Sequence, residues 1–328
     1  MKFTEEQLNR AAGVVLTQAC GDALGVPYEM AEPPRSEPAM IGGGLGDYAP
    51  GEWSDDTQMS VCILTVAATG ADLTSDQALR TICQGFRAWY ADNPADIGIH
   101  TRSVLREDAA TDAPEDPAAM LRASEAVHRR TGQSAGNGAL MRTGIVGLTR
   151  LADREATAQA AREAARVTHW DDLAGESGVL WCEAIRVAVI EGELDLASGV
   201  DLLPIQRRTR WLAIIDEAAT SDPRVFTGNG FTVTALQAAW SSIVKSSRSA
   251  TEHPIRGALH TAISVGNDTD TVAAITGALV GARYGASAVP RPWRRMVHGW
   301  PGMDGESLVR LATLTAGQGQ FPVTTGTA

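Results

Sequence analysis

The sequence predicts an all-α fold, on the strength of its helical periodicity and the near absence of strand patterns. Near the N-terminus, apolar residues recur at helical spacing: Leu8, Ala12, Val15 and Ala19. The Ala-rich segment 151–166 and the segment 173–190 have the same periodicity, with one apolar face each. Alternating patterns are scarce, and the best candidate strand is the short segment 231–233. We therefore expect helices to make up nearly the whole structure.

Breaks between the expected helices are short. They fall at residues 32–48, 112–117 and 222–230, where Pro, Gly and Asp gather. None of them is long or polar enough to be a linker between domains. We therefore predict a single compact domain over residues 1–317, with residues 318–328 as a flexible tail.

Composition narrows the class of protein. A chain of 328 residues with 44% hydrophobic and 20% charged residues has ordinary globular composition and can bury a core without disulfides. The formal net charge of −11 argues against binding to duplex nucleic acid, which depends on neutralising phosphates with Lys and Arg. A small phosphate-bearing ligand stays open, provided that metal ions, helix N-termini or backbone amides bind it.

Cysteines and the N-terminus indicate a cytoplasmic protein. The four cysteines are far apart in apolar surroundings, so we expect buried free thiols rather than a zinc site or a disulfide framework. The N-terminus carries Glu5 and Glu6 and lacks the basic-then-apolar pattern of a signal peptide. No apolar run approaches the length of a membrane span. The expected location is therefore cytoplasmic.

Two short acidic blocks each precede an apolar helical run. Trp53-Ser54-Asp55-Asp56-Thr57-Gln58 opens the first, and Gly266-Asn267-Asp268-Thr269-Asp270-Thr271 opens the second. Either block alone is explained by helix capping, because Asp, Ser and Thr are favoured at helix N-termini. A cap, however, needs one side-chain oxygen, and each block offers two carboxylates and several hydroxyls.

The helix after the second block carries glycines with four-residue spacing. Gly277 and Gly281 permit close packing against a neighbouring helix, although an interior helical glycine costs roughly 1 kcal/mol. A helix that accepts this cost is expected to be buried. If the two acidic blocks converge, four carboxylates share one cleft and require a compensating cation. All the donors are oxygens, which favours Mg²⁺ or Mn²⁺ over Zn²⁺. With four carboxylates, two divalent cations are favoured over one.

Five sequence motifs resemble the ADP-ribosylglycohydrolase family (the dinitrogenase reductase-activating glycohydrolase and ADP-ribosylhydrolase type) in order and spacing. The resemblance runs from about Ala12 to Tyr284, and five motifs in order are strong evidence. The motifs are Gly21-Asp22-Ala23-Leu24-Gly25 with Pro27 and Glu29; Ser54-Asp55-Asp56-Thr57; Gly136-Asn137-Gly138-Ala139-Leu140-Met141-Arg142; Thr168-His169; and Asp268-Thr269-Asp270-Thr271.

The resemblance implies an all-α domain with a binuclear Mg²⁺ or Mn²⁺ centre at helix N-termini. Two positions depart from the family pattern without removing a ligand: Ser54 stands where threonine is more usual, and Asn267 stands where glycine is common. By position, the implied metal ligands are Ser54, Asp55, Asp56, Asp268, Asp270 and Thr271.

The resemblance also assigns catalytic roles. Glu29 matches a glutamate that lies over the metal centre, and Asp96 resembles an aspartate linked in some members to handling of the ribose. Without the resemblance, Glu29 would be read as a solvated loop residue and Asp96 as a turn residue beside Pro94. A carboxylate that ligates a metal is a poor proton donor, so Glu29 first and Asp96 second are the expected acid or base.

Substrate contacts are implied for one loop and one histidine. In the family, residues at Ser134, Gly136, Asn137 and Gly138 form a wall for the distal ribose and diphosphate, and His169 faces the phosphates. The plainer alternatives are a tight Asn-Gly turn and a structural histidine.

The function implied is hydrolysis of the glycosidic bond at the distal ribose of an ADP-ribosylated target, through an oxocarbenium-like transition state, with release of ADP-ribose. The alternatives are a two-metal phosphoesterase and an inactive family member that binds ADP-ribose or has a structural role. The acceptor stays open between arginine, serine and a small ADP-ribose conjugate. A paired ADP-ribosyltransferase, the choice of metal and the oligomeric state are also left open.

Overall fold

Helices and short connections form almost all of the structure, a computed structural model that describes residues 2–110, 116–248 and 253–322. In these residues the strands are β1 (His298–Gly299) and β2 (Met303–Asp304), which form one antiparallel hairpin. The α-helices in chain order are α1 (Glu5–Gly25), α2 (Asp55–Ala67), α3 (Asp76–Ala91), α4 (Ile99–Ala109), α5 (Pro117–Thr131), α6 (Leu140–Thr143), α7 (Arg154–Arg166), α8 (Asp172–Glu191), α9 (Ile205–Thr220), α10 (Thr232–Ser247), α11 (Pro254–Ile263), α12 (Thr269–Tyr284), α13 (Arg291–Met296) and α14 (Gly305–Ala316). Short 3₁₀ helices are η1 (Val26–Tyr28), η2 (Gly144–Leu148), η3 (Ala197–Leu202), η4 (Pro223–Val225) and η5 (Ala286–Ala288).

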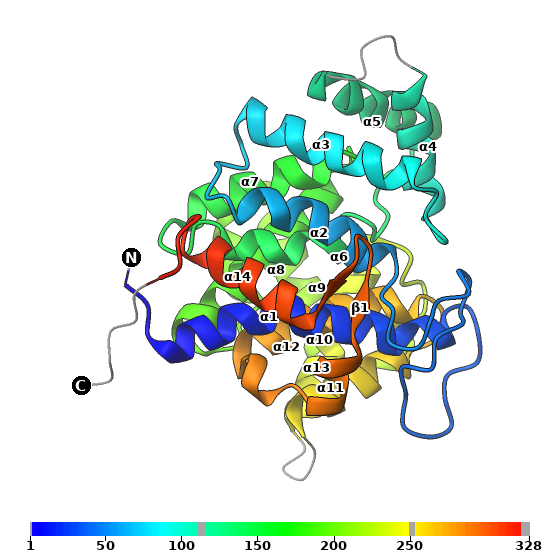
Figure 1. Ribbon diagram of the computed structural model, residues 1–328, viewed down its shortest axis with the longest axis vertical. Coiled ribbons are helices and arrows are strands. Elements are labelled where there is room, and N and C mark those ends of the chain that lie inside the picture. Colours follow the sequence, from blue (N-terminus) through cyan, green and yellow to red (C-terminus); the bar gives the residue numbers. More distant parts are fainter. Residues whose placement is uncertain (1, 111–115, 249–252, 323–328) are drawn as a thin grey trace.

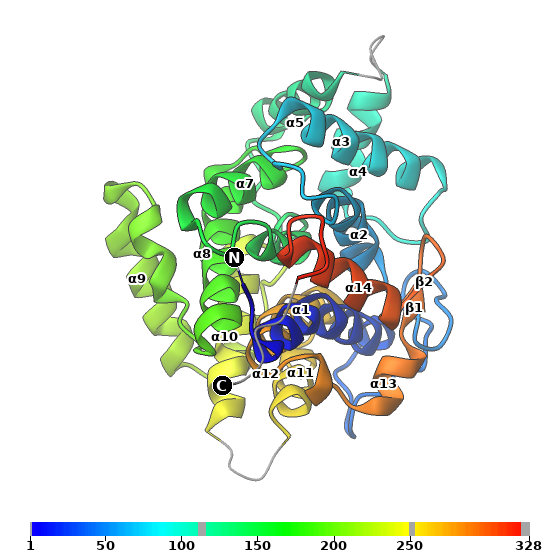
Figure 2. The same cartoon turned by 60° about the vertical axis from the view of Figure 1, so that its left-hand side comes forward.

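The arrangement is a single domain built around α1 and α12, which lie at its centre (Figure 1). Helices α3, α4 and α5 form a layer at one end of the molecule, where α3 packs on α2 (Figure 1). In the second view α9 and the β1–β2 hairpin lie at opposite edges (Figure 2). The prediction of an all-α single domain is therefore confirmed.

Helices α1 and α12 pack in antiparallel orientation through glycines. A Cβ on Gly277 would lie 2.3 Å from the carbonyl oxygen of Thr17, and one on Gly281 would lie 2.0 Å from that of Gly13. At the other end, a Cβ on Gly21 would lie 2.2 Å from the carbonyl oxygen of Ala273. Because no side chain fits between them, the two backbones touch, as the glycine spacing of α12 predicted.

This register carries the end of α1 to the beginning of α12. A Cβ on Gly25, the last residue of α1, would lie 2.3 Å from the Cα of Asp270. The start of α1 is fixed independently: the side chains and backbone N–H groups of Thr4 and Gln7 form a reciprocal capping box. The position of Asp270 relative to α1 is therefore set by backbone contact rather than by flexible side chains.

The other helices expected from periodicity are also present. The segment 151–166 becomes α7, which starts three residues later because Asp153 caps it through a bond from the Ala156 N–H. The segment 173–190 becomes α8, which Asp171 caps. All four cysteines are free and buried, as predicted.

The predicted strand at 231–233 is wrong. Phe231 makes a single antiparallel bridge with Gly136, and α10 begins at the next residue, Thr232. A residue with extended backbone before a helix gives the same local sequence pattern as a short strand. The bridge ties Phe231 to the glycine-rich loop at Gly136.

Two of the three predicted breaks lie fully within the described residues. Residues 32–48 form an irregular segment, and 222–230 holds only η4. Most of the break at 112–117 lies outside the described residues. Of the predicted tail, residues 318 and 319 lie against Thr69 and Gly70, and residues 323–328 lie outside the described part of the chain.

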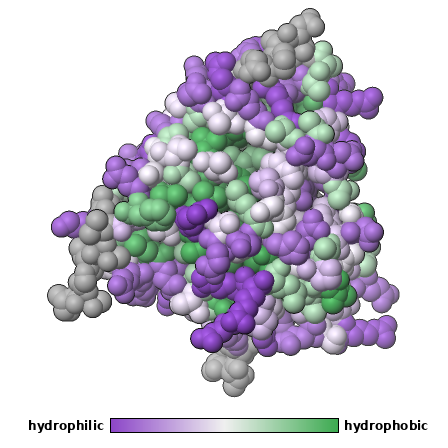
Figure 3. Space-filling view, viewed as in Figure 1, coloured by the Kyte–Doolittle hydropathy of each residue, from purple (hydrophilic) through white to green (hydrophobic). Residues whose placement is uncertain are grey.

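The surface on the face seen in Figure 1 is mostly hydrophilic, with hydrophobic residues gathered left of its centre, in the region of α2 and α14 (Figure 3). Within the described residues, no helix has both the length and the apolar character needed to cross a bilayer.

The glycine contact predicts opposite effects for two Gly→Ala substitutions. Gly277→Ala should lower the free energy of unfolding by ~2 kcal/mol or more, because its Cβ would meet the Thr17 carbonyl and force the helices apart. Gly178→Ala, also in a buried helix, should be neutral or stabilising by up to about 1 kcal/mol, because its Cβ would meet nothing closer than 3.7 Å. Chemical denaturation of both variants measures this difference. Equal effects would contradict the proposed backbone contact.

Candidate metal centre and substrate cleft

Two acidic groups meet where α1 ends and where α2 and α12 begin. Asp22, Asp56 and Asp270 each place a carboxylate oxygen within 4.8 Å of the others. Glu29, Asp268 and Asp270 form a second group of the same kind. Asp270 belongs to both, so the two groups are contiguous. The two acidic blocks of the sequence therefore converge, and Asp22 and Glu29 join them.

Asp22 organises the start of α2. Its Oδ1 accepts hydrogen bonds from the backbone N–H and the hydroxyl of Ser54, both at 2.8 Å. Its Oδ2 accepts from the N–H and the hydroxyl of Thr57, at 3.0 and 2.6 Å. Asp22 thus takes the place of a local cap, since Ser54 makes no capping bond of its own.

Sequence reasoning did not select Asp22 as a site residue. A signal was present: Asp22 continues the apolar face of α1 that passes through Val15 and Ala19, where a carboxylate is out of place. A fully buried aspartate is rare unless it is paired or binds a metal.

Hydroxyl groups complete the cluster. Ser54 Oγ lies 3.1 Å from Asp56 Oδ2 and 3.3 Å from Asp270 Oδ2. Thr271 Oγ1 lies 3.3 Å from the same Asp56 oxygen. The second oxygen of Asp56 is buried and has no hydrogen-bond partner among the described residues. An unpartnered buried carboxylate oxygen beside other oxygens is what a cation-binding site presents.

Crowding of the acids disfavours their charged forms. Burial raises the pKa of Glu29 to about 8, with further contributions from the charges of Asp268 and Asp96. Burial and the neighbouring carboxylates raise the pKa of Asp55 to about 7, and burial raises that of Asp22 to about 6. The pKa values of Asp56 and Asp270 are raised well above the ordinary range, first by burial and then by the charges of neighbouring carboxylates. A divalent cation would reverse this trend, because it stabilises the deprotonated forms.

The donor set fits a hard cation. Every candidate ligand atom is a carboxylate or hydroxyl oxygen, which suits Mg²⁺ or Mn²⁺ rather than Zn²⁺. Asp55 is the predicted ligand least involved in the two acidic groups; it accepts a bond from the Gly98 backbone and faces the cleft. The other five predicted ligand positions lie together, with Ser54 and Asp56 buried beneath the cleft floor.

The cleft above these acids has a volume of about 390 Å³. It is open to solvent, and its walls come from segments far apart in the sequence. The predicted site residues that line it are Glu29, Asp55, Asp96, Gly136, Asn137, Gly138, His169, Asp268, Asp270 and Thr271.

Asn137 ties the glycine-rich loop to the acids. Its side-chain amide donates to Asp268 Oδ2 at 2.7 Å and to the backbone carbonyl of Asn229 at 2.8 Å. Asn229 in turn accepts from the Asp268 N–H and donates to the Gly266 carbonyl. Asn229 was not predicted as a site residue, although its Gly228-Asn229-Gly230 setting marked a turn. The amide of Asn137 is therefore occupied within the protein.

His169 packs beneath the same loop. A Cβ on Gly136 would lie 3.3 Å from its ring, and one on Gly138 would lie 3.1 Å from it, so a side chain at either position would crowd the ring. His169 is buried, its ring centroid lies 4.6 Å from that of His100, and its Nδ1 is 2.8 Å from the Thr168 hydroxyl. Burial lowers the pKa of His169 well below its ordinary value, so the ring is neutral.

Arg142 lies under both of these segments. Its guanidinium donates to the Gly138 carbonyl at 2.9 Å and to the Thr168 hydroxyl at 2.7 Å, and it lies over the Phe86 ring. The side chain is fully buried, and burial lowers its pKa to about 9. Arg142 thus joins the loop before α6 to the turn after α7.

Ser134 occupies a different place from the other predicted substrate residues. Its hydroxyl is 2.6 Å from His128 Nδ1 and accepts from the Asp171 N–H at 3.0 Å. It lines an adjoining cavity, which shares His100, Gly136 and Gly230 with the acidic cleft. The structure therefore brings Ser134 beside the cleft rather than into it.

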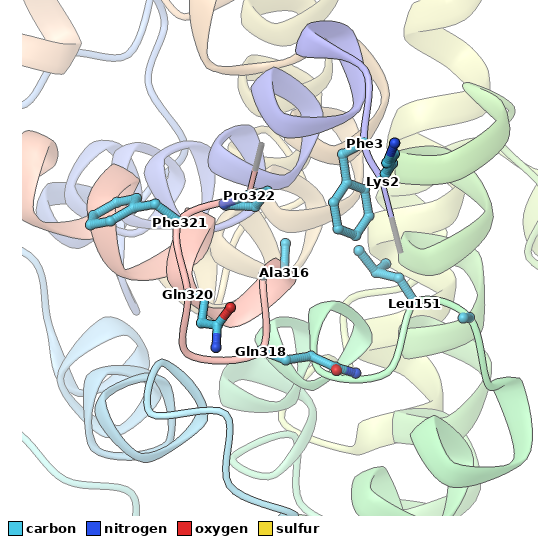
Figure 4. A pocket seen from close by; sticks show the side chains of 10 residues that line it. Lys2, Phe3, Leu151, Ala316, Gln318, Gln320, Phe321 and Pro322 are labelled. Atoms are coloured by element: carbon cyan, nitrogen blue, oxygen red, sulfur yellow. The ribbon is translucent and has the colours of Figure 1, made fainter. Parts of the chain in front are cut away.

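A larger cavity of about 640 Å³ lies elsewhere, between Phe3, Leu151 and residues 316–322 (Figure 4). Among its lining residues Lys2 is the only ionisable one, and the lining otherwise consists of apolar and amide side chains. The chemistry is therefore concentrated in the smaller, acidic cleft.

Comparison with known proteins agrees with this geometry. The family model for ADP-ribosylglycohydrolase matches residues 4–321. An ADP-ribosylarginine hydrolase, Tri1, of Pseudomonas putida (strain GB-1) is 29% identical over 309 residues, which cover 88% of this chain and 74% of the relative. ADP-ribosyl-[dinitrogen reductase] glycohydrolase of Rhodospirillum rubrum is 26% identical over 298 residues, which cover 87% of this chain and 89% of the relative.

A solved structure has the same fold. The chain of an ADP-ribosylglycohydrolase-related protein complex superimposes with a TM-score of 0.71 and 27% sequence identity, covering 96% of this chain and 100% of that chain. The fold and the acidic cleft define an all-α hydrolase-like scaffold with a site at helix N-termini. The chain belongs to the ADP-ribosylglycohydrolase family.

The crowded acids predict a pH-dependent effect of metal on stability. Unfolded carboxyls lose their protons near pH 4, whereas Asp22, Asp55 and Glu29 keep theirs to about pH 6, 7 and 8 in the metal-free fold. The metal-free fold therefore binds more protons than the unfolded chain in this range, and its stability should fall as pH rises. Mg²⁺ bound to the deprotonated acids would offset this loss.

We expect the difference in Tm between Mg²⁺-loaded and chelator-treated protein to widen by several degrees from about pH 5 to about pH 8. Thermal unfolding in parallel buffers measures it. A Tm difference that stays the same from pH 5 to pH 8 would contradict the binding of a cation by these acids.

Proposed function

We propose that this protein is a divalent-cation-dependent hydrolase that cleaves the glycosidic bond at the distal ribose of an ADP-ribosylated target and releases ADP-ribose. The family removes ADP-ribose from modified targets. The observation that carries the proposal is the convergence of Asp22, Asp56 and Asp270 with Glu29 and Asp268 at one open cleft.

Two cations, Mg²⁺ or Mn²⁺, fit the two contiguous acidic groups that share Asp270. The residues that would hold them are Asp22 or Ser54 with Asp56, Asp270 and Thr271 on one side, and Asp55, Asp268 and Asp270 on the other, with Glu29 beside this second group as an unligated carboxyl. Bound cations would orient the ribose hydroxyls and lower the pKa of a water molecule.

The protein's own residues supply the remaining parts of the reaction. Glu29 is the favoured acid or base, because it faces the cleft beside the acidic groups and is not one of the predicted metal ligands. Asp96 is the second candidate; its Oδ1 accepts the N–H of Ile97 at 2.7 Å, which fixes its orientation at the cleft wall. The loop at Gly136–Gly138 leaves room for the ribose and diphosphate because two of its positions lack side chains.

Arginine is the favoured acceptor. A guanidinium group is a cation, and the cleft that would receive it is lined by Glu29, Asp55 and Asp96. Two relatives named as ADP-ribosylarginine hydrolases, from Pseudomonas putida and Serratia proteamaculans, each align with 88% of this chain. Serine-linked and small conjugates are the alternatives that a substrate screen distinguishes. Free ADP-ribose as the product identifies the glycohydrolase, and AMP or phosphate would identify a phosphoesterase instead.

Two substitutions separate binding of the substrate from its cleavage. Asp270→Asn removes a charge shared by both acidic groups and should lower metal content, ADP-ribose affinity and activity together. Glu29→Gln keeps the shape but removes the proton-transfer group, so turnover should fall by ~10²–10⁴ while metal content and ADP-ribose affinity stay near the wild-type values. Elemental analysis, calorimetry with ADP-ribose and a release assay measure the three quantities.

Glu193→Gln is the matched control, because Glu193 is exposed in the connection after α8 and away from the cleft. It should behave like the wild-type protein in all three assays. If Glu29→Gln loses metal as Asp270→Asn does, Glu29 is a ligand and Asp96 becomes the acid or base. Wild-type turnover in Glu29→Gln would remove Glu29 from the mechanism altogether.

A further inference from the structure

Large apolar side chains are exposed around the mouth of the acidic cleft. The described part of the chain has ten exposed large hydrophobic residues, and three of them line this one cleft. Ile99 is 88% exposed, Met30 is 62% exposed and Leu45 is 59% exposed. Single exposed hydrophobic residues need no explanation, but three at the edge of one cleft form a patch. We call Met30, Leu45 and Ile99 the apolar rim.

The backbone holds the apolar rim in place beside the catalytic candidates. Met30 follows Glu29 in the left-handed conformation, with φ of 52°, and its N–H donates to the Asn267 carbonyl at 2.7 Å. Ile99 is the first residue of α4 and comes three residues after Asp96. The rim therefore has a fixed position relative to both candidate acids.

Leu45 is held by the glycines on either side of it. A Cβ on Gly44 would lie 2.4 Å from the Val26 carbonyl oxygen, and one on Gly46 would lie 2.9 Å from the Ala95 side chain. The loop is also closed by paired backbone bonds between Gly43 and Tyr48, at 2.8 and 2.9 Å. These contacts place Leu45 next to the segment that carries Asp96 and Ile99, with its side chain in solvent.

The rim contrasts with the interior that it surrounds. The floor and walls of the cleft carry carboxylates, whereas the three rim side chains carry no polar atoms. The proposed function places the distal ribose over these acids, in a cleft of about 390 Å³. The group joined to the anomeric carbon must therefore extend out through the mouth of the cleft, where it contacts the apolar rim.

We propose that the apolar rim is the docking surface for the polypeptide on either side of the modified residue, and that it selects apolar side chains there. This inference rests on the proposed function. A protein substrate rather than a free amino acid follows from it, because a small acceptor would leave three large hydrophobic side chains in water. Burying them against apolar neighbours is favourable and excludes water from the cleft.

A matched pair of ADP-ribosylated peptides tests the proposal. The two peptides carry the linkage that the wild-type protein cleaves and differ only in the residues next to it, which are Leu in one and Ser in the other. The wild-type protein should favour the Leu peptide by about 10-fold in kcat/KM, the effect of a modest apolar contact. Ile99→Ser and Leu45→Ser should each bring this ratio towards one.

Ile205→Ser is the control, because Ile205 is an equally large apolar side chain, 70% exposed on α9 and outside the cleft. It should retain the wild-type preference. A wild-type ratio near one, or a ratio kept by both rim variants, would overturn the docking surface. So would faster release from ADP-ribosyl-arginine than from either peptide, or a dimer in sedimentation analysis that Ile99→Ser dissociates. A substrate screen in which no ADP-ribosylated conjugate releases ADP-ribose would instead refute the proposed function on which the rim depends.

Discussion

The backbone contact between α1 and α12 is the constraint on which the site depends. Gly13, Gly21 and Gly25 on one helix and Gly277 and Gly281 on the other leave no room for side chains between them. The contact fixes the antiparallel register of the helices to a fraction of a turn. Asp22 near the end of α1 is thereby placed beside Asp270 in the first turn of α12. Glycine destabilises each helix, and the close packing that it allows compensates for this cost.

From this contact the position of α2 follows. Asp22 accepts hydrogen bonds from the backbone N–H and the hydroxyl of both Ser54 and Thr57. These bonds attach the first turn of α2 to α1. Asp56 is then directed at Asp270. This arrangement brings carboxyl groups together in a buried place, where burial raises the pKa of each. The N-termini of two helices offset only part of the charge that they carry when ionised. Such a group of acids destabilises the fold, and bound cations would offset this cost.

The glycine-rich wall of the cleft is held by a different kind of interaction. Arg142 has no carboxylate partner among its hydrogen bonds; it donates to carbonyl and hydroxyl oxygens of segments on both sides of it. Asn137 and Asn229 connect the same loop to Asp268. The loop that would contact the diphosphate and the acids that would bind the cations are therefore parts of one hydrogen-bonded network.

The sequence by itself determined the helical class and the single domain, because both depend on local periodicity and on short connections. It also determined the acidic helix entrances at Ser54–Asp56 and Asp268–Thr271, because two carboxylates in one helix start exceed what capping needs. Glu29, Asn137 and His169 came only from the resemblance, since a lone polar residue in a loop has no local signal of its function. The strand expected at 231–233 failed because one extended residue before a helix has the same pattern.

Only the tertiary structure decided how these parts meet. Asp22 became a central residue because the α1–α12 register carries it to Asp270, which lies 248 positions further along the chain. Ser134 was placed in the adjoining cavity because His128 and Asp171 take up its hydroxyl. Arg142, Asn229 and the apolar rim have no recognisable spacing, since their roles arise from contacts between distant segments. Periodicity reports which face of a helix is buried, and only packing decides what that face is buried against.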